Sequence, residues 1–135
     1  MAVVDALGDD EQRAKLLPDL IALKKTISFG LTEPTNGSDA SDLRTTAKTV
    51  EGGYRLTGRK RWIGNATFAD YIIVWAKNEK ENNKVQGFLV TKGSKGLLTE
   101  KMEGKLACRM TQNTDIYMYD VFVPFNMRLT HATDF

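Results

Sequence analysis

The segment RKRWIGNATFADYIIVWA, residues 59–76, contains two extended stretches joined by a turn at Gly64 and Asn65. Its second half, YIIVWA, is a continuous apolar run rich in β-branched and aromatic residues, as expected of a buried strand. Trp75 lies inside this run and is expected in the core. Trp62 ends the first strand behind three basic residues, so it is either a core residue or a stacking wall for a planar ligand.

Similar β-rich segments lie on both sides of this one. They are TTAKTVE (45–51), YRLTGRKRWIG (54–64), VQGFLVTK (85–92), LLTEKME (97–103) and IYMYDVFV (116–123), and they are separated by turn residues at 52–53, 82–83 and 93–96. Six or seven strands with short connections predict a mainly β fold, namely an antiparallel β-barrel or sandwich with a short N-terminal helical segment.

The N-terminal segment has a helical pattern. Asp9 and Asp10 are favourable at a helix start, and apolar residues then recur at about helical spacing. Pro18 predicts an interruption, with a short helix, a turn and then a second short helix or an extended link. This piece is too short to bury its own apolar face, so we expect partner elements outside the 135 residues.

The composition excludes several classes of protein. The formal net charge of +2 gives no reason to expect nucleic acid or an anionic membrane as a partner. The apolar runs are far shorter than the roughly 20 residues of a membrane-spanning helix. The single cysteine, Cys108, excludes an internal disulfide and is expected in the core, and one cysteine with one histidine cannot form a zinc site of the usual kind.

The loop FGLTEPTNGSDAS, residues 29–41, is a candidate ligand site. Gly37 permits a positive φ or a close backbone approach, and Ser38 with nearby N–H groups could cradle a phosphate. Thr32 offers a hydroxyl and an N–H where a strand ends, and Phe29 could flank a flat ring. On residue types alone, an ordinary surface turn is the simpler interpretation.

Two motifs taken together resemble the acyl-CoA dehydrogenase and oxidase flavoprotein family. GLTEPTNGSD (30–39) is similar to the signature loop of the family's middle β domain, and RWIGN (61–65) is similar to its Trp-Ile-Thr-Asn strand end. The resemblance covers roughly residues 9–124. Residues 59–73 and 109–116 look closest to plant peroxisomal short-chain acyl-CoA oxidases, and glutaryl-CoA dehydrogenases are next.

The resemblance implies a division into domains and a reaction. Residues 1–26 would end an N-terminal helical domain, 27–124 would form the middle β domain, and 125–135 would begin a C-terminal helical domain. The family's reaction is α,β-oxidation of an acyl-CoA thioester, with hydride transfer to FAD. The catalytic glutamate would lie in the C-terminal domain, so we assign no catalytic residue here and expect the isolated chain to be inactive. Glu33 is expected to be a loop acid that pairs locally.

The resemblance also implies which residues bind FAD: Phe29, Gly30, Leu31, Thr32, Gly37, Ser38, Trp62, Ile63 and Gly64. Thr32 would bond the isoalloxazine edge, and residues 62–64 would line the other side of the ring. Ser38 would reach the FAD pyrophosphate or the CoA portion of the substrate. Gly64 stands where the dehydrogenases usually carry threonine, which suggests room for dioxygen.

The partners implied are acyl-CoA, dioxygen if the protein is an oxidase, and further copies of the chain in a homo-oligomer. The compartment implied is the peroxisome, with the mitochondrial matrix as the alternative. Two other functions are open: a non-catalytic truncated relative, or a small β-barrel that binds nucleic acid through GRKRW (58–62).

Overall fold

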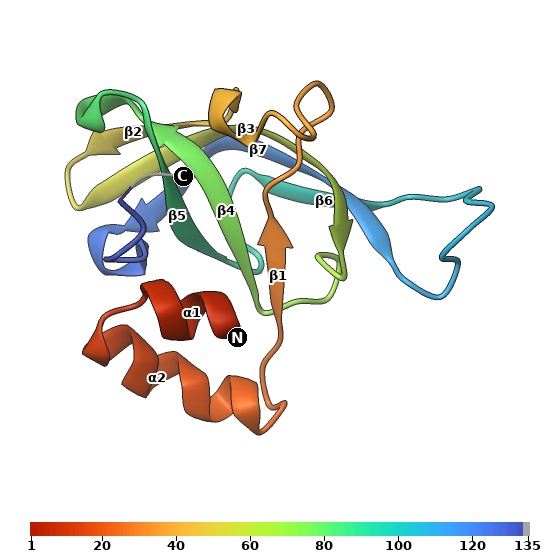
Figure 1. Ribbon diagram of the computed structural model, residues 1–135, viewed down its shortest axis with the longest axis horizontal. Coiled ribbons are helices and arrows are strands. Elements are labelled where there is room, and N and C mark those ends of the chain that lie inside the picture. The colour runs from red at the N-terminus through yellow and green to blue at the C-terminus, as the bar shows by residue number, and fades with distance from the viewer. Residues whose placement is uncertain (134–135) are drawn as a thin grey trace.

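The structure is a computed structural model that describes residues 1–133 (Figure 1). Within this range the chain forms helices α1 (Ala2–Leu7) and α2 (Asp10–Ile21), followed by strands β1 (Ile27–Gly30), β2 (Thr46–Val50), β3 (Gly53–Gly64), β4 (Tyr71–Asn78), β5 (Lys84–Thr91), β6 (Leu97–Lys101) and β7 (Asn113–Pro124). Three short 3-10 turns, η1 (Ala40–Asp42), η2 (Glu79–Glu81) and η3 (Phe125–Met127), complete these elements. The predicted fold class, mainly β with a short N-terminal helical segment, is confirmed.

The strands form one curled sheet in the order β1-β4-β2-β3-β7-β6, and β5 pairs with the other edge of β4. Most pairs are antiparallel, but β1 and β2 both run parallel to β4. The reason lies in the loop between them. β1 pairs with the first half of β4, the chain then leaves the sheet, and β2 returns to pair with the end of β4. β1 and β2 thus act as two parts of one interrupted strand.

Strand β4 is buried on both faces, which explains its continuous apolar run. Ile72, Val74 and Ala76 face the interior of the curled sheet. Ile73 and Trp75 alternate with them and face the opposite side, where they pack under the two helices. Trp75 is only 4% exposed, so its predicted place in the core is confirmed.

The helices cover the outer face of β4 and β5 (Figure 1). Val4 of α1 and Leu16 and Leu20 of α2 supply the apolar contacts. The start of α2 is as predicted, because Asp9 and Gln12 form a capping box. The prediction for Pro18 is wrong, since this residue lies inside α2. Pro18 has no N–H to donate to the carbonyl of Ala14. The helix tolerates this because Ala14 and Pro18 are both exposed, so water can bond the free carbonyl.

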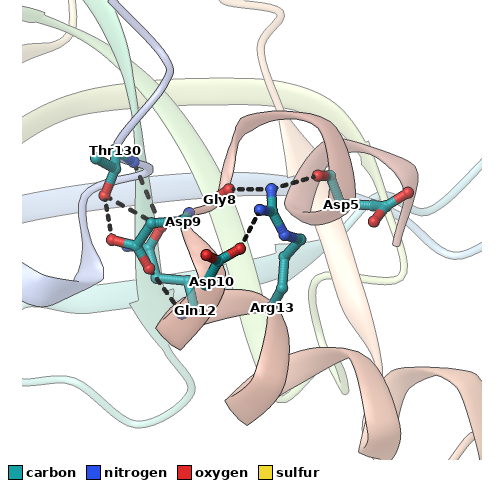
Figure 2. A network of polar contacts seen from close by, with 7 residues as sticks. All are labelled: Asp5, Gly8, Asp9, Asp10, Gln12, Arg13 and Thr130. Carbon is teal, nitrogen blue, oxygen red and sulfur yellow. Dashed lines mark hydrogen bonds and ion pairs between the residues drawn. The ribbon is translucent and has the colours of Figure 1, made fainter.

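Polar contacts fasten the helix pair to the segment that follows β7 (Figure 2). The hydroxyl of Thr130 donates to Oδ2 of Asp9 at 2.7 Å, and the Thr130 N–H donates to Oε1 of Gln12 at 3.3 Å. Arg13 donates to the carbonyl of Gly8 at 2.7 Å and so ties α2 to the end of α1. The helices, which precede the sheet in sequence, are therefore fixed to the chain that leaves it.

The predicted turns are confirmed by backbone angles. Asn82 and Asn83 have φ of 54° and 59°, and Gly96 has φ of 87° where a Cβ would lie 2.1 Å from the Tyr119 carbonyl oxygen. Cys108 is exposed, so its predicted place in the core is wrong. It lies in the connection between β6 and β7, which extends away from the rest of the sheet (Figure 1).

Among residues 1–133, no helix has the length and apolar character needed to cross a bilayer. The same residues contain no group of three or more His, Cys, Asp or Glu side chains placed to hold a metal ion.

Candidate functional site

The end of β1 and the end of β3 lie side by side, although they are far apart in sequence. The hydroxyl of Ser28 donates to the Gly64 carbonyl at 2.8 Å. The N–H of Arg61 donates to the Thr32 carbonyl at 2.9 Å. The loop after β1 and the Trp62 strand end, which the sequence pairs as motifs, are therefore neighbours in the fold.

Trp62 presents an exposed indole at this junction. Its side chain is 53% exposed, so the interpretation of Trp62 as a core residue is wrong. Its φ of 63° is in the left-handed region, which is costly for a bulky residue and is seen more often at functional sites. The Arg61 guanidinium lies 5.2 Å from the indole centre, and Asn113 donates to the Trp62 carbonyl at 3.1 Å. The neighbouring Ile63 is buried and anchors the strand end.

Phe29 and Gly30 belong to β1. Phe29 is 44% exposed and makes an edge contact with Trp75, with the ring centres 6.0 Å apart. Gly30 is buried, and a Cβ there would lie 3.0 Å from the Ile73 carbonyl oxygen. Gly30 therefore allows β1 to lie close against β4, and its role in the fold is evident without any ligand.

Thr32 is the best-placed donor of the loop. Its carbonyl is used by Arg61, but its hydroxyl and N–H donate no hydrogen bond within residues 1–133. Leu31 precedes it and is partly buried against the apolar cluster between β4 and the two helices. A ligand with acceptor atoms at its edge could therefore bond Thr32 while its flat face rests near Trp62.

The rest of the loop folds into a local turn. The Glu33 N–H donates to the Asn36 carbonyl at 3.0 Å, and the Asn36 side chain donates to the Asp42 carbonyl at 2.9 Å. Gly37 has no positive φ, and a Cβ there would meet nothing within 4 Å, so neither predicted reason for a glycine is found. Ser38 is exposed, and no hydrogen bond within residues 1–133 joins it to Trp62.

A buried ion pair lies beneath the loop, and sequence reasoning missed it. Nζ of Lys60 lies 2.9 Å from Oε1 of Glu33, and the two side chains are 0% and 2% exposed. Glu33 also accepts from the N–H groups of Arg44 at 2.7 Å and Thr45 at 2.9 Å, and from the Thr45 hydroxyl. The expectation that Glu33 pairs locally is wrong, because its carboxylate bonds Arg44 and Thr45, 11 and 12 residues along the chain, and Lys60 on β3, 27 residues along the chain. The alternation of β3, with Arg59 and Arg61 on the opposite face, was the available signal.

The environment of the pair lowers the pKa of both Glu33 and Lys60. Burial alone raises the pKa of Glu33, but hydrogen bonds from Thr45, Lys60 and Arg44 outweigh it and hold this pKa below its ordinary value. Burial lowers the pKa of Lys60 to about 8, although the Glu33 carboxylate opposes the change. Glu33 therefore stays ionised at neutral pH and has its acceptor sites occupied.

The other basic residues of GRKRW are also paired. Arg59 lies 3.3 Å from Oδ2 of Asp115, and Arg61 lies 3.8 Å from Oδ1 of the same residue. With Lys60 buried against Glu33, this segment offers no run of unpaired positive charge. The observation that supported a nucleic-acid-binding module is therefore removed.

An open apolar cavity of about 420 Å³ lies beside the site, between the end of α2, β1 and the turn after β3. Ile21, Ile27 and Phe68 are among its walls, and Asn65 connects it to the strand end that carries Trp62. Its lining suits an apolar group better than a charged one.

Comparison with known proteins gives the same assignment for most of the chain. The family described as "Acyl-CoA dehydrogenase, middle domain" matches residues 28–121. A probable acyl-CoA dehydrogenase of Bacillus subtilis is 38% identical over 119 residues, which are 87% of this chain and 20% of that protein. A short-chain-specific acyl-CoA dehydrogenase of Megasphaera elsdenii is 37% identical over 87% of this chain and 31% of that protein.

A solved structure of a glutaryl-CoA dehydrogenase from Mycobacterium smegmatis, in complex with FADH2, superposes with a TM-score of 0.91 and 31% identity. The superposition covers 97% of this chain and 33% of that one. The chain thus spans between a fifth and a third of the length of these relatives. It belongs to the acyl-CoA dehydrogenase family, and the family's middle domain accounts for residues 28–121.

Proposed function

We propose that this chain is the flavin-holding part of an acyl-CoA dehydrogenase and binds FAD between the loop after β1 and the end of β3. One observation carries the proposal. The Arg61 N–H donates to the Thr32 carbonyl, Thr32 keeps two donors that no acceptor within residues 1–133 uses, and the residue after Arg61 is the exposed Trp62; these contacts support the proposal. A relative of the same fold, described as a complex with FADH2, supports the choice of ligand.

The residues present suit a flat ring with a polar rim. Thr32 would orient the ring edge through its hydroxyl and N–H, and Trp62 would shield the apolar face from water. Ser38, exposed beyond the turn, would reach the FAD pyrophosphate or the CoA portion of the substrate. The full proposed set is Phe29, Gly30, Leu31, Thr32, Gly37, Ser38, Trp62, Ile63 and Gly64. Bound FAD would supply the hydride acceptor for the oxidation of the substrate.

The proposed substrate is a short-chain acyl-CoA thioester, in line with the Megasphaera relative. Removal of its α proton needs a base with a free lone pair near the ring. Glu33 does not meet this need, because it is buried and its carboxylate is occupied by Lys60, Thr45 and the Arg44 N–H. We therefore assign proton removal to a group outside this chain and predict no acyl-CoA oxidation by the chain alone.

The electron acceptor is a finer point. The relatives compared above are dehydrogenases, which favours transfer to another protein over transfer to dioxygen. The single feature that favours an oxidase is Gly64, where an added Cβ would meet only Thr111, at 3.9 Å. Peroxisomal or mitochondrial location and homo-oligomer formation stay predictions.

A titration of the purified chain with FAD tests the proposal. We expect flavin fluorescence to change on binding, and we expect Thr32→Val and Trp62→Ala to weaken it about tenfold or more, as loss of a hydrogen bond or a stacking face implies. Thr99→Val on β6 is the control for Thr32→Val, because it removes a hydroxyl outside the site. Equal affinities in all variants, or no binding by the unchanged chain, would contradict the proposal.

A further inference from the structure

The loop between β1 and β2 leaves a gap in the sheet, and Glu33 fills it. The chain leaves β4 after Gly30 and returns at Thr45, whose carbonyl accepts from the Lys77 N–H at 2.9 Å. The N–H groups of Arg44 and Thr45, which have no strand partner there, donate instead to the Glu33 carboxylate at 2.7 and 2.9 Å. One side chain thus replaces a stretch of backbone pairing.

Strand β3 holds the opposite side of the same gap. Lys60 Nζ donates to the Leu31 carbonyl at 3.0 Å and to Glu33 at 2.9 Å. The neighbouring Arg61 N–H donates to the Thr32 carbonyl at 2.9 Å. Residues 31, 32 and 33 are therefore each bonded to one of two consecutive residues of β3, and Trp62 is the next residue along that strand.

Such a pair is poorly explained by stability alone. Taking two charges out of water is unfavourable, and apolar side chains of similar size are often as stable in their place. What the ammonium group adds is several donors on one atom, so that Lys60 bonds the Leu31 carbonyl and the Glu33 carboxylate at the same time. A less buried pair in the same region, Lys77 with Asp42 at 2.8 Å, has a similar distance, but its side chains are 24% and 67% exposed.

We propose that the Lys60–Glu33 pair is a positioning element of the flavin site. It holds residues 31–33 against β3, so that the Thr32 donors and the Trp62 indole keep the separation that a flat ring requires. Lys60 and Glu33 touch neither ring nor substrate in this role and act through the residues between them. The inference rests on the proposed function in one respect, the identity of the ligand.

The test uses the whole chain with Lys60→Met, Glu33→Gln and the double variant. Each single variant leaves one buried group without its partner and is expected to fold less stably. The double variant leaves no unpaired buried charge, so we expect it to keep the fold while it loses the side-chain bonds between the loop and β3, with the Arg61 N–H bond to the Thr32 carbonyl left alone. Asp42→Asn with Lys77→Met is the matched control, since it removes a Lys–carboxylate pair that solvent reaches.

Amide hydrogen exchange of the flavin-free chain is the first readout. In the double variant we expect the Arg61 N–H to exchange at least about tenfold faster, while amides of β4 and β5 keep their protection. The second readout is FAD affinity, which we expect to fall about 10- to 100-fold in the double variant, the loss that a charged hydrogen bond represents. The control pair is expected to change neither.

Each result decides a different point. Unchanged exchange of the Arg61 N–H in a folded double variant would overturn the positioning role, whether or not the FAD affinity changes. Faster Arg61 exchange with unchanged FAD affinity would also overturn the positioning role. The pair would then hold the loop against β3 without affecting flavin binding. Failure of the unchanged chain to bind FAD, with faster exchange in the double variant, would overturn the proposed function and with it the role of the pair in flavin binding.

Discussion

The ammonium group of Lys60 lies 2.9 Å from the Glu33 carboxylate, and solvent reaches almost none of either side chain. Glu33 follows Thr32 in the loop, and Lys60 lies two residues before Trp62 on β3. Thr32 and Trp62, which form the candidate slot for the flavin ring, are thus each close in sequence to one member of the same buried ion pair. The proposed positioning role therefore predicts that the stability of the pair and the geometry of the slot are coupled.

The two members of this pair are predicted to be non-additive in stability. Glu33→Gln leaves the Lys60 charge buried without its counterion, so we expect it to lower the free energy of unfolding by about 3–5 kcal/mol at pH 7. Adding Lys60→Met should recover part of that loss and give a coupling energy of about 1–3 kcal/mol. Urea unfolding of the four proteins measures both values. Additive effects, as expected for the less buried Asp42 and Lys77, would show that the pair is not coupled.

Acid is predicted to weaken the fold through Glu33. Its folded-state pKa is below the unfolded one, because hydrogen bonds from Thr45, Lys60 and Arg44 overcome the effect of burial. Its contribution to stability is therefore complete above the ordinary glutamate pKa of about 4.3 and is lost as pH falls through the folded-state value. The midpoint of thermal unfolding, measured from pH 6 to pH 3, should fall more steeply for the unchanged chain than for Glu33→Gln. Parallel curves would contradict this assignment.

Trp62 is predicted to matter for ligand binding more than for folding. Trp62 is 53% exposed and its backbone is left-handed, so the strain that Trp62→Gly relieves offsets much of the loss of the buried half of the side chain. We expect the free energy of unfolding to change by less than about 1 kcal/mol. Trp75→Ala, in the core, should lower it by about 3–5 kcal/mol. Similar losses for the two variants in denaturant unfolding would mean that Trp62 is a packing residue after all.

Gly64→Thr tests the proposed oxygen path. A Cβ at this position has no neighbour closer than 3.9 Å, so the variant should fold with nearly unchanged stability. If Gly64 admits dioxygen, the added side chain should slow the reoxidation of reduced flavin by oxygen in a protein that carries this domain. Stopped-flow absorbance measures that rate, and an unchanged rate would remove the proposal that Gly64 admits dioxygen.

Much of the fold was predictable because local signals and tertiary contacts agree. The run YIIVWA becomes β4, since apolar residues on both faces suit a strand between two cores. The turns at Asn82 and Gly96 follow from residues that tolerate left-handed backbone. The parallel pairing of β1 and β2 with β4 could not be predicted, because it depends on where a loop leaves the sheet and returns.

The site was predictable in part for the same reason. Thr32 and Trp62 were identified through motifs, and the fold places their segments together. Lys60 was hidden between two arginines, where a lysine is normally solvated, and only its acceptors on distant segments make burial possible. Cys108 was misplaced because residue type alone does not show that the connection after β6 leaves the body of the domain.

The central claim is that the loop after β1 and the end of β3 flank one flat ring. It is tested most directly by titrating the isotope-labelled chain with FAD and following every backbone amide by NMR. We expect the largest shifts at residues 29–32 and 62–64, with contacts between isoalloxazine protons and the Trp62 indole. Shifts confined to other surfaces, such as the connection between β6 and β7, or no shifts at saturating FAD, would contradict the account.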